Sequence, residues 1–193
     1  LRYELGLPNT GFVFCCFNNN YKITPSTFTG WMRILKSVED SVLWLLEKNN
    51  NTTKNLKKEA MKFGINEDRL VFATHMPVEE HLNRIQLADL FIDTLPYNAH
   101  TTTSDALRMG LPVLTCIGNS FASRVAASLL NAINLPELIT TTQEQYESLA
   151  IELAKDPEKL KIIKDKLVNN LSTAPLYDTP LFTRHLESAY LTM

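Results

Sequence analysis

The chain has 193 residues, of which 45% are apolar and 21% are charged, and its formal net charge is -2. This length suits one well-buried domain with appended helices, and the balanced charge offers no basic surface, so no nucleic-acid partner is expected. No apolar run approaches the roughly 20 residues of a membrane helix and no signal segment is evident, so we expect a cytoplasmic protein without a membrane partner.

Short apolar runs alternate with amphipathic segments over the first 142 residues. The sequence predicts strands at residues 12–17, 41–46, 69–73, 90–93 and 112–116, with a short sixth strand at 138–140. It predicts helices at 25–38, 54–63, 78–88, 103–109 and 121–133, and a surface loop at 47–53. Continuous apolar strands alternating with helices are typical of an α/β fold, here a Rossmann-like parallel sheet with helices on both faces.

The C-terminal region has a different pattern. From residue 143 no strand pattern returns, and helices are predicted at 143–154, 157–171 and 180–191. We expect a Rossmann-like domain over residues 1–142 and C-terminal helices over 143–193 that pack on the same domain. The chain starts at Leu1 and its first strand follows within a dozen residues, with no cap or arm predicted before it. We therefore expect a piece of a longer protein, cut at a domain boundary.

Three cysteines are present. Cys15 and Cys16 are neighbours on a predicted strand, where successive side chains point to opposite faces. We expect small buried apolar side chains in a reducing compartment, with neither a disulfide nor a metal role.

The richest polar stretch is DTLPYNAHTTTSD, residues 93–105, between a predicted strand and a predicted helix. It places four consecutive hydroxyl residues, 101–104, behind His100. One of these hydroxyls is enough to cap the helix, which is the ordinary alternative. The surplus favours contacts to a phosphate at the helix N-terminus, where backbone N–H groups are free. Asp105, expected on the first helical turn, either accepts from ribose hydroxyls or favours the helix dipole.

Other strand-end loops carry polar groups that a parallel sheet would bring to the same edge. Lys22 ends the loop NNNYK and would neutralise a diphosphate; the alternative is an asparagine-rich turn with a solvated lysine. His81 and Arg84 share one face of the helix predicted from residue 78, and the alternative for Arg84 is a surface salt bridge with Glu80. The loop 118–124 also precedes a predicted helix and has small polar residues, but it indicates a ligand contact only weakly.

Several site classes are disfavoured. The spacing of His75, His81 and His100 matches no common zinc pattern, so no metal is expected. No G-x-G-x-x-G or Walker sequence is present, which argues against NAD enzymes and ATPases. A lysine, helix termini and hydroxyls could stabilise a leaving diphosphate without a metal or other cofactor.

Five segments in this order carry a family resemblance. They are FNNNYKITPST (17–27), SVLWLL (41–46), MPVEEHLNRIQLADLFIDT (76–94), NAHTTTSDAL (98–107) and SRVAASLL (123–130). With them the chain resembles the C-terminal part of the catalytic region of protein O-GlcNAc transferases and their SPINDLY-like relatives. Members have two Rossmann-like domains with the active site between them, and this chain looks like the second, donor-binding half of such a GT-B glycosyltransferase.

The resemblance also implies roles for individual residues. Asn19 and Lys22 are implied to contact the diphosphate, with Lys22 stabilising the leaving group and Asn19 standing where the O-GlcNAc enzymes have glutamine. The resemblance implies further contacts to the nucleotide sugar. At the base these are the backbone of Met76 and the side chains of His81 and Arg84. At the phosphates they are His100, Thr101 and Thr102, and at the ribose Asp105.

The expected activity follows from this resemblance. It is the inverting, metal-independent transfer of N-acetylglucosamine from UDP-GlcNAc to protein Ser or Thr. The general base is expected in a preceding domain that these residues do not include. A helical-repeat (TPR) region is expected in the parent protein. The piece alone is expected to be inactive, and its last helix, 180–191, to pack against the missing half. Val78 stands where the O-GlcNAc enzymes have a nucleotide-contacting lysine, and Thr74 and His75 also depart from the pattern. GDP-fucose as donor, hexose transfer to Asn, and a non-catalytic nucleotide-binding scaffold remain alternatives.

Overall fold

The computed structural model describes residues 1–193 and has a six-stranded parallel sheet with the order β3-β2-β1-β4-β5-β6. The strands are β1 (Phe12–Cys16), β2 (Ser41–Leu46), β3 (Leu70–Ala73), β4 (Leu90–Ile92), β5 (Val113–Cys116) and β6 (Ile139–Thr140). All five strand pairs are parallel. The predicted α/β class and all six strands are confirmed.

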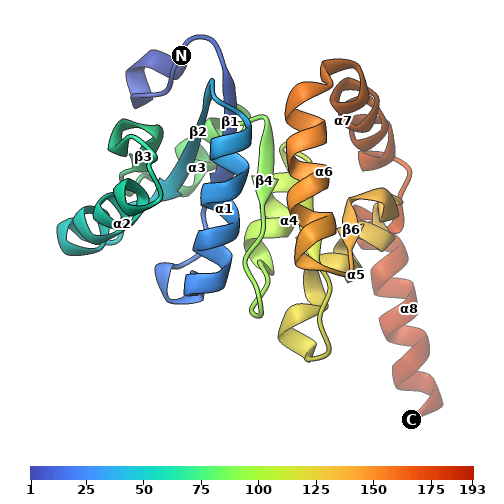
Figure 1. The fold of residues 1–193 in the computed structure, drawn as a ribbon. Coiled ribbons are helices and arrows are strands. Elements are labelled where there is room, and N and C mark those ends of the chain that lie inside the picture. The colour runs from blue at the N-terminus through green and yellow to red at the C-terminus, as the bar shows by residue number, and fades with distance from the viewer.

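Helices cover both faces of this sheet, as a parallel sheet requires. They are α1 (Pro25–Ser37), α2 (Asn50–Lys62), α3 (Val78–Ile85), α4 (Thr101–Arg108), α5 (Val125–Ala132), α6 (Gln143–Lys155), α7 (Pro157–Leu171) and α8 (Thr179–Thr192). In Figure 1, α1 and α6 lie side by side in front of the sheet, and α3 and α4 lie behind it. The crossover helix α1 thus lies on one face of the sheet, and the crossover helices α3 and α4 lie on the other.

The chain direction across the sheet reverses between β1 and β4, which are neighbours. Ligands of open α/β sheets bind at such a switch point, outside the carboxyl ends of the strands. The loops that follow β1 and β4 meet there, along the lower edge of the sheet in Figure 1. These are the two loops in which the sequence places Lys22 and His100.

Two helix starts differ from the prediction. Helix α2 begins at Asn50, inside the predicted loop 47–53, because the Asn49 side chain accepts the backbone N–H of Thr52 (2.9 Å) as an N-cap. Helix α4 begins at Thr101, two residues earlier than predicted. Asp105 therefore lies on the second turn of α4, and its predicted place on the first turn is wrong.

Three smaller differences concern helix ends and the N-terminus. Helix α3 ends at Ile85 rather than at residue 88, and the predicted helix 121–133 is divided into a 3-10 turn, Phe121–Ser123, and α5. An N-terminal arm also exists, contrary to the prediction: a 3-10 helix spans Arg2–Leu5. Arg2 anchors this arm by donating to the backbone carbonyl of Leu87 (3.0 Å) and to the Asp89 carboxylate (2.8 Å).

The core is apolar and continuous across both faces of the sheet. Its largest fully buried side chains include Trp31, Trp44, Tyr146 and Phe14. Cys15, Cys16 and Cys116 are unpaired and buried, and burial raises the pKa of all three thiols, so they remain neutral apolar groups. No helix is long and apolar enough to cross a bilayer.

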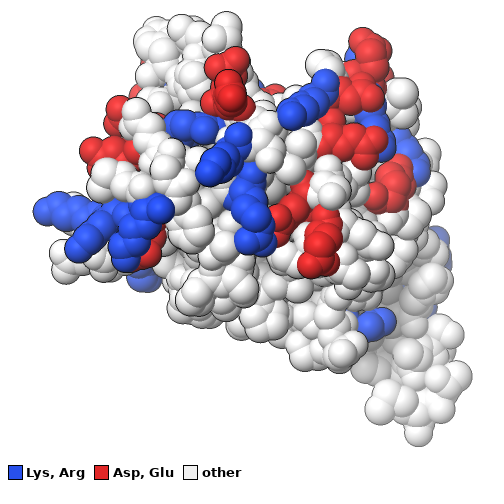
Figure 2. All heavy atoms as spheres, in the orientation of Figure 1, with Lys and Arg blue, Asp and Glu red and all other residues white.

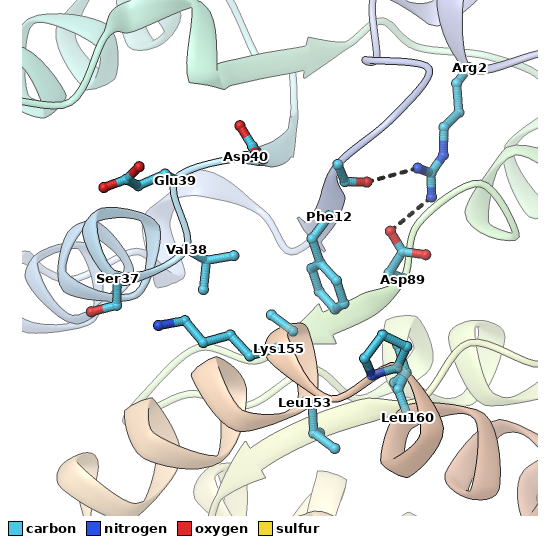
Figure 3. Close-up of a pocket in the computed structure, with 13 residues that line it drawn as sticks. Arg2, Phe12, Ser37, Val38, Glu39, Asp40, Asp89, Leu153, Lys155 and Leu160 are labelled. Carbon is cyan, nitrogen blue, oxygen red and sulfur yellow. Dashed lines mark hydrogen bonds and ion pairs between the residues drawn. The ribbon is translucent and has the colours of Figure 1, made fainter.

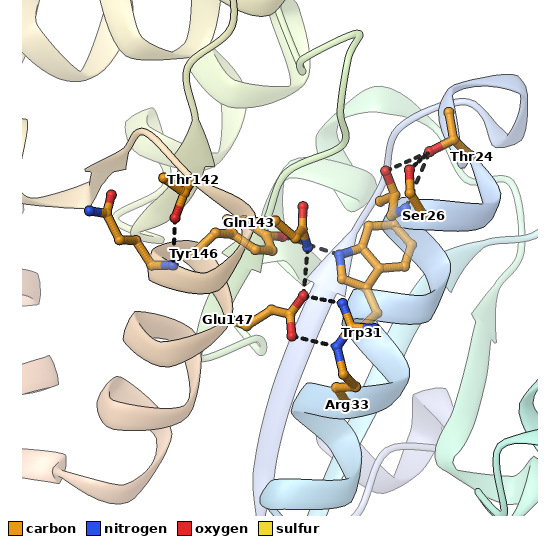
Figure 4. A network of polar contacts seen from close by, with 10 residues as sticks. Thr24, Ser26, Trp31, Arg33, Thr142, Gln143, Tyr146 and Glu147 are labelled. Atoms are coloured by element: carbon orange, nitrogen blue, oxygen red, sulfur yellow. Dashed lines mark hydrogen bonds and ion pairs between the residues drawn. The ribbon is translucent and has the colours of Figure 1, made fainter.

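Helix α6 is joined to α1 by a polar seam (Figure 4). Arg33 makes two hydrogen bonds with the carboxylate of Glu147 (2.7 and 2.6 Å). A Cβ at Gly30 would meet the ends of the Gln143 and Glu147 side chains, so a larger residue there would displace these two side chains from the seam. In the centre, Trp31 Nε1 donates to the hydroxyl of Tyr146 (3.1 Å), which donates to the backbone carbonyl of Asp93 (2.9 Å).

Replacing Tyr146 by phenylalanine tests this seam. The change keeps the ring but leaves the indole N–H of Trp31 and the Asp93 carbonyl unpaired in a dry core. We expect the free energy of unfolding to fall by about 1–3 kcal/mol, measured by urea denaturation. Tyr177→Phe is the matched control, because Tyr177 is only partly buried and its hydroxyl bonds a single carbonyl, that of Ser104. Equal losses in the two variants would contradict this account.

Surface charge is unevenly distributed on the face shown in Figure 2. Lys and Arg gather over α2 at one side, whereas Asp and Glu gather over α6 and both signs are mixed over α7 at the other side. The lower edge of this face, where the strand-end loops lie, is largely uncharged. An anionic ligand would therefore meet no acidic surface on that edge from this side.

Candidate functional site

Asp93 is the centre of the switch point. Its carboxylate is fully buried, and Oδ1 accepts the backbone N–H groups of Thr94 and Ala99 (both 2.7 Å). Oδ2 accepts the hydroxyl of Thr115 on β5 (2.7 Å). Burial raises the pKa of Asp93 to about 6, and these hydrogen bonds oppose the rise. The carboxylate thus ties both ends of the 94–99 loop to the end of β4.

Asn18, buried at the end of β1, extends this network across the switch point. Its amide nitrogen donates to Thr94 Oγ1 (2.8 Å) and to Asp93 Oδ1 (3.2 Å). Its amide oxygen accepts the hydroxyl of Thr102 on the first turn of α4 (3.0 Å). Asn18 therefore fixes the loops after β1 and β4 and the start of α4 relative to one another.

Lys22 lies beside the 94–99 loop. Its Nζ donates to the backbone carbonyl of Asn98 (2.9 Å) and lies 3.9 Å from the centroid of the Tyr97 ring. Partial burial lowers the pKa of Lys22, whereas the charge of Asp93 raises it. The buried side-chain atoms of Asn20 and the Oδ1 atom of Asn98 have no partner within the chain. The region around partly exposed Lys22 thus contains three polar side-chain atoms that make no hydrogen bond within the chain.

The N-terminus of α4 is not capped by any side chain, so the alternative of a hydroxyl cap is wrong. His100 occupies the N-cap position, and its Nε2–H donates to the backbone carbonyl of Ala122 (3.3 Å). The first backbone N–H groups of the helix, at Thr101 and Thr102, are left free for an anion. The imidazole of His100 also lies 5.2 Å from the Tyr97 ring, centroid to centroid, which connects it to Lys22.

His81 and Arg84 lie on α3, on the other side of β1. The His81 ring packs at 5.2 Å from the ring of Phe17, the residue before Asn18. Arg84 is buried and donates to His81 Nδ1 (3.0 Å) and to the backbone carbonyl of Thr74 (2.6 Å). No salt bridge joins Arg84 to Glu80, so that alternative is wrong. The two residues are placed by direct packing on the end of β1.

The structure brings some of the predicted site residues together and leaves others apart. Lys22, His100, Thr102 and His81 are connected through the ends of β1 and β4 by the contacts above. Four further residues make no side-chain hydrogen bond to another predicted site residue: Asn19 and Thr101, which are exposed, Met76, and Asp105. Burial raises the pKa of the Asp105 carboxyl, and the charge of Arg108 opposes this.

Three residues of the site were not predicted from the sequence as site residues. Asn18 and Asp93 connect the loops, and Tyr97 lies between Lys22 and His100. The first two had a detectable signal, because each is a polar residue directly after an apolar strand, where it must be buried and hydrogen-bonded. Nothing in the sequence distinguishes Tyr97 from an ordinary loop aromatic.

A separate cavity of about 640 Å³ lies at the opposite edge of the sheet, at the amino ends of β1 and β4 (Figure 3). Phe12, Leu153 and Leu160 form its apolar part, and the ion pair of Arg2 with Asp89 lies at its side. None of the predicted site residues lines this cavity. It is therefore distinct from the strand-end site.

Comparisons with known proteins show which family the chain belongs to. The sequence profile of glycosyl transferase family 41 matches residues 1–186. A Caenorhabditis elegans UDP-N-acetylglucosamine–peptide N-acetylglucosaminyltransferase is 38% identical over 186 residues, which cover 96% of this chain and 16% of that protein. The chain thus spans about a sixth of the length of this curated relative.

Solved structures show the same fold. A mutant of the Thermobaculum terrenum O-GlcNAc transferase superposes with a TM-score of 0.88 at 33% identity, covering 93% of this chain and 35% of that one. An Anabaena protein, HepE, solved in complex with UDP, shares the fold at 14% identity, with a TM-score of 0.70 over 100% of this chain and 51% of that one. The Rossmann-like sheet is that of one half of a GT-B glycosyltransferase, and the chain belongs to glycosyl transferase family 41.

Proposed function

We propose that this chain is the donor-binding half of an inverting glycosyltransferase that moves N-acetylglucosamine from UDP-GlcNAc to a protein Ser or Thr. One observation carries the proposal: a half-buried lysine and an uncapped helix N-terminus are held side by side at the switch point by Asn18 and Asp93. That combination suits a diphosphate. The C. elegans relative, a UDP-N-acetylglucosamine–peptide N-acetylglucosaminyltransferase, suggests the sugar and the peptide acceptor.

In this proposal the chain binds the donor in one orientation. The diphosphate lies on Lys22, Asn19 and the start of α4 with His100, Thr101 and Thr102; the base lies beside Met76 and His81, and the ribose at Asp105. The acceptor hydroxyl attacks the anomeric carbon, and the bond from that carbon to the diphosphate oxygen breaks. Lys22 and the helix N-terminus stabilise the negative charge on the departing UDP without a metal. The hydroxyl proton goes to a base outside these residues.

The identity of the nucleotide is the least constrained part of this proposal. Val78, the first residue of α3, is 73% exposed and stands where the family resemblance implies a lysine. A valine there removes a cation from the base side of the site. This favours, as a second candidate, the same fold with another donor such as GDP-fucose.

Calorimetric titration distinguishes the two candidates. UDP is expected to bind this chain and GDP to bind at least tenfold more weakly. Tighter binding of GDP would support the second candidate, and no binding of either nucleotide would contradict both. Transfer of labelled N-acetylglucosamine to protein is expected only from a longer protein that includes the preceding region. A longer protein that binds UDP without transfer would indicate a non-catalytic module.

Helix α8 supports the proposal of a further domain. None of its side chains is buried, and Phe182 and Tyr190 are 64% and 65% exposed. In Figure 1 it extends beyond the body of the domain. A helix that exposes large apolar side chains in this way is expected to pack on another part of the parent protein, which in this proposal is the preceding catalytic domain. A helical-repeat region is proposed before that domain.

Substitution of the exposed apolar residues of α8 tests this placement. Phe182→Ser combined with Tyr190→Ser is expected to change the unfolding free energy of this chain by less than about 0.5 kcal/mol, because neither residue is buried. The same pair is expected to lower the melting temperature of a longer protein by several degrees. A large loss of stability in the short chain would show that α8 packs on this domain instead.

A further inference from the structure

Helices α2 and α7 carry four lysines each, and the two sets differ in their partners. Every lysine of α7 lies within 3.6 Å of a carboxylate oxygen: Lys159, Lys161, Lys164 and Lys166. On α2 only Lys62 is paired, with Glu59 (2.6 Å). Lys54, Lys57 and Lys58 make no ion pair. The fold therefore neutralises the lysines of α7 but leaves most of those on α2 without a counter-charge.

Helix α2 is strongly basic, although the chain as a whole is not. It contains four lysines and one glutamate, a net charge of +3, in a chain whose net charge is -2. No acidic residue lies in its first turn, where a carboxylate would stabilise the helix. Figure 2 shows the basic side chains gathered over α2 at one side of the molecule. The positive charge is thus concentrated on one exposed element.

Three of these lysines form a row along the outer face of α2. Lys54, Lys58 and Lys62 are spaced by four residues, so their side chains lie on one face, about 6 Å apart. Like charges at this spacing destabilise a helix. The pair of Lys62 with Glu59 is exposed, and such a pair holds its lysine only weakly. The row is therefore unfavourable for α2 by itself, and carboxylates of a partner would relieve the repulsion.

The neighbours of the row favour a polypeptide as this partner. Met61 is three residues from Lys58 and seven from Lys54, so it lies beside the row, and it is 52% exposed. Its flexible, unbranched side chain packs on apolar side chains of different shapes. Helix α2 has no aromatic residue on which a nucleobase could stack, as surfaces for single-stranded nucleic acid do.

We propose that the outer face of α2, with Lys54, Lys58, Met61 and Lys62, is a docking surface for an extended acidic segment of a partner protein. In an extended chain, side chains two residues apart lie on one face, about 7 Å apart. A segment with Glu or Asp on alternate residues therefore matches the spacing of the lysine row. The proposal is independent of the proposed function, because α2 packs beside β3, at the edge of the sheet, and contributes no residue to the strand-end site.

Titration of two labelled peptides into this chain, followed by fluorescence anisotropy, tests the proposal. In the first, of about eight residues, glutamate alternates with threonine; the second has the same residues in one block of each. At low salt the alternating peptide is expected to bind at least about threefold more tightly, because it presents twice as many carboxylates to one face. Roughly 0.5 M salt should abolish this binding, since the lysines are exposed. The backbone amide NMR signals that shift on binding are expected to be those of α2.

Two triple variants locate the binding surface. Replacing Lys54, Lys58 and Lys62 by glutamine is expected to weaken binding of the alternating peptide by roughly tenfold, from three exposed charge contacts. The matched control replaces Lys159, Lys161 and Lys166 of α7 by glutamine, which removes the same charge, and it should change the affinity by less than about twofold. Urea denaturation checks folding, and the α2 variant is expected to be no less stable than wild type, because its like-charge pairs are gone.

Four results would overturn the proposal. The first is no binding of the alternating peptide at low salt, and the second is equal affinity for the two peptides, which would indicate unspecific attraction. The third is equal weakening by the two triple variants, which would be an effect of net charge. The fourth is tighter binding of a thymidine oligonucleotide than of the alternating peptide, which would make α2 a nucleic-acid surface. Because the titrations contain no nucleotide sugar, failure of the proposed donor site would leave all four readouts unchanged.

Discussion

Asp93→Ala is expected to lower the free energy of unfolding by on the order of 4 kcal/mol, whereas Asp93→Asn should cost much less. Alanine leaves four donors without an acceptor: the N–H groups of Thr94 and Ala99, the Asn18 amide and the Thr115 hydroxyl. An asparagine oxygen can accept the same three N–H donors as Oδ1. Its amide group can donate to Thr115, whose hydroxyl is free to rotate.

The difference in stability between wild type and Asp93→Asn is expected to depend on pH. The folded-state pKa of about 6 lies above the ordinary value of 3.8, so the folded chain binds this proton more tightly than the unfolded chain does. The contribution of Asp93 to stability is therefore fully present below pH 3.8 and is lost as the pH rises through 6. Asparagine does not titrate.

Urea denaturation of wild type and Asp93→Asn between pH 4 and 8 measures this effect. The stability of wild type relative to Asp93→Asn is expected to fall over that range, by at most about 3 kcal/mol. A difference that stays constant would mean that Asp93 does not change its protonation in the folded chain. Equal losses in the alanine and asparagine variants would show that the hydrogen bonds are not what holds the loop.

Lys22→Met is expected to weaken UDP binding by roughly 10- to 100-fold, the effect of losing a charge-assisted hydrogen bond of about 1.5–3 kcal/mol. Methionine keeps the contact with the Tyr97 ring but removes the ammonium group that donates to the carbonyl of Asn98, in the loop that leads into α4. In a longer, active protein the transfer rate is expected to fall by about 10²–10³, because charge develops on the leaving diphosphate during the reaction.

The matched control is Lys54→Met, which removes an equal charge from the exposed face of α2. It should leave UDP affinity unchanged at physiological salt, because α2 does not border the switch point. If both variants weaken binding equally, the effect is a general one of net charge. If Lys22→Met binds UDP as tightly as wild type, the diphosphate does not lie on Lys22.

Much of the fold could be predicted from the sequence because its signals are local. The strands are continuous apolar runs, and FVFCCF or SVLWLL can be buried on both faces only in a parallel sheet. Helix starts were less accurate because Asn, Ser and Thr favour both loops and N-caps. Asn49 caps α2 inside a segment that has the composition of a loop, and α4 begins without any cap.

The candidate site was partly predictable for a related reason. The carboxyl ends of parallel strands lie on one edge, so Lys22 and His100 could be placed on the same edge before the structure was known. The contacts of Arg84 could not, because they depend on the direction of one guanidinium. Sequence spacing allowed a salt bridge with Glu80, yet the side chain turns inward to His81 and the carbonyl of Thr74. Likewise Asn18 acts through a contact with Thr102, 84 residues away along the chain.

The most direct test of the central claim is a crystal structure of this chain with UDP. The diphosphate is expected at the N-terminus of α4, within hydrogen-bond distance of Lys22 Nζ and the backbone N–H groups of Thr101 and Thr102, with the base beside His81. Nucleotide bound instead in the cavity lined by Phe12 and Leu153 at the opposite edge of the sheet would contradict the account, as would UDP bound at the switch point with its diphosphate away from Lys22.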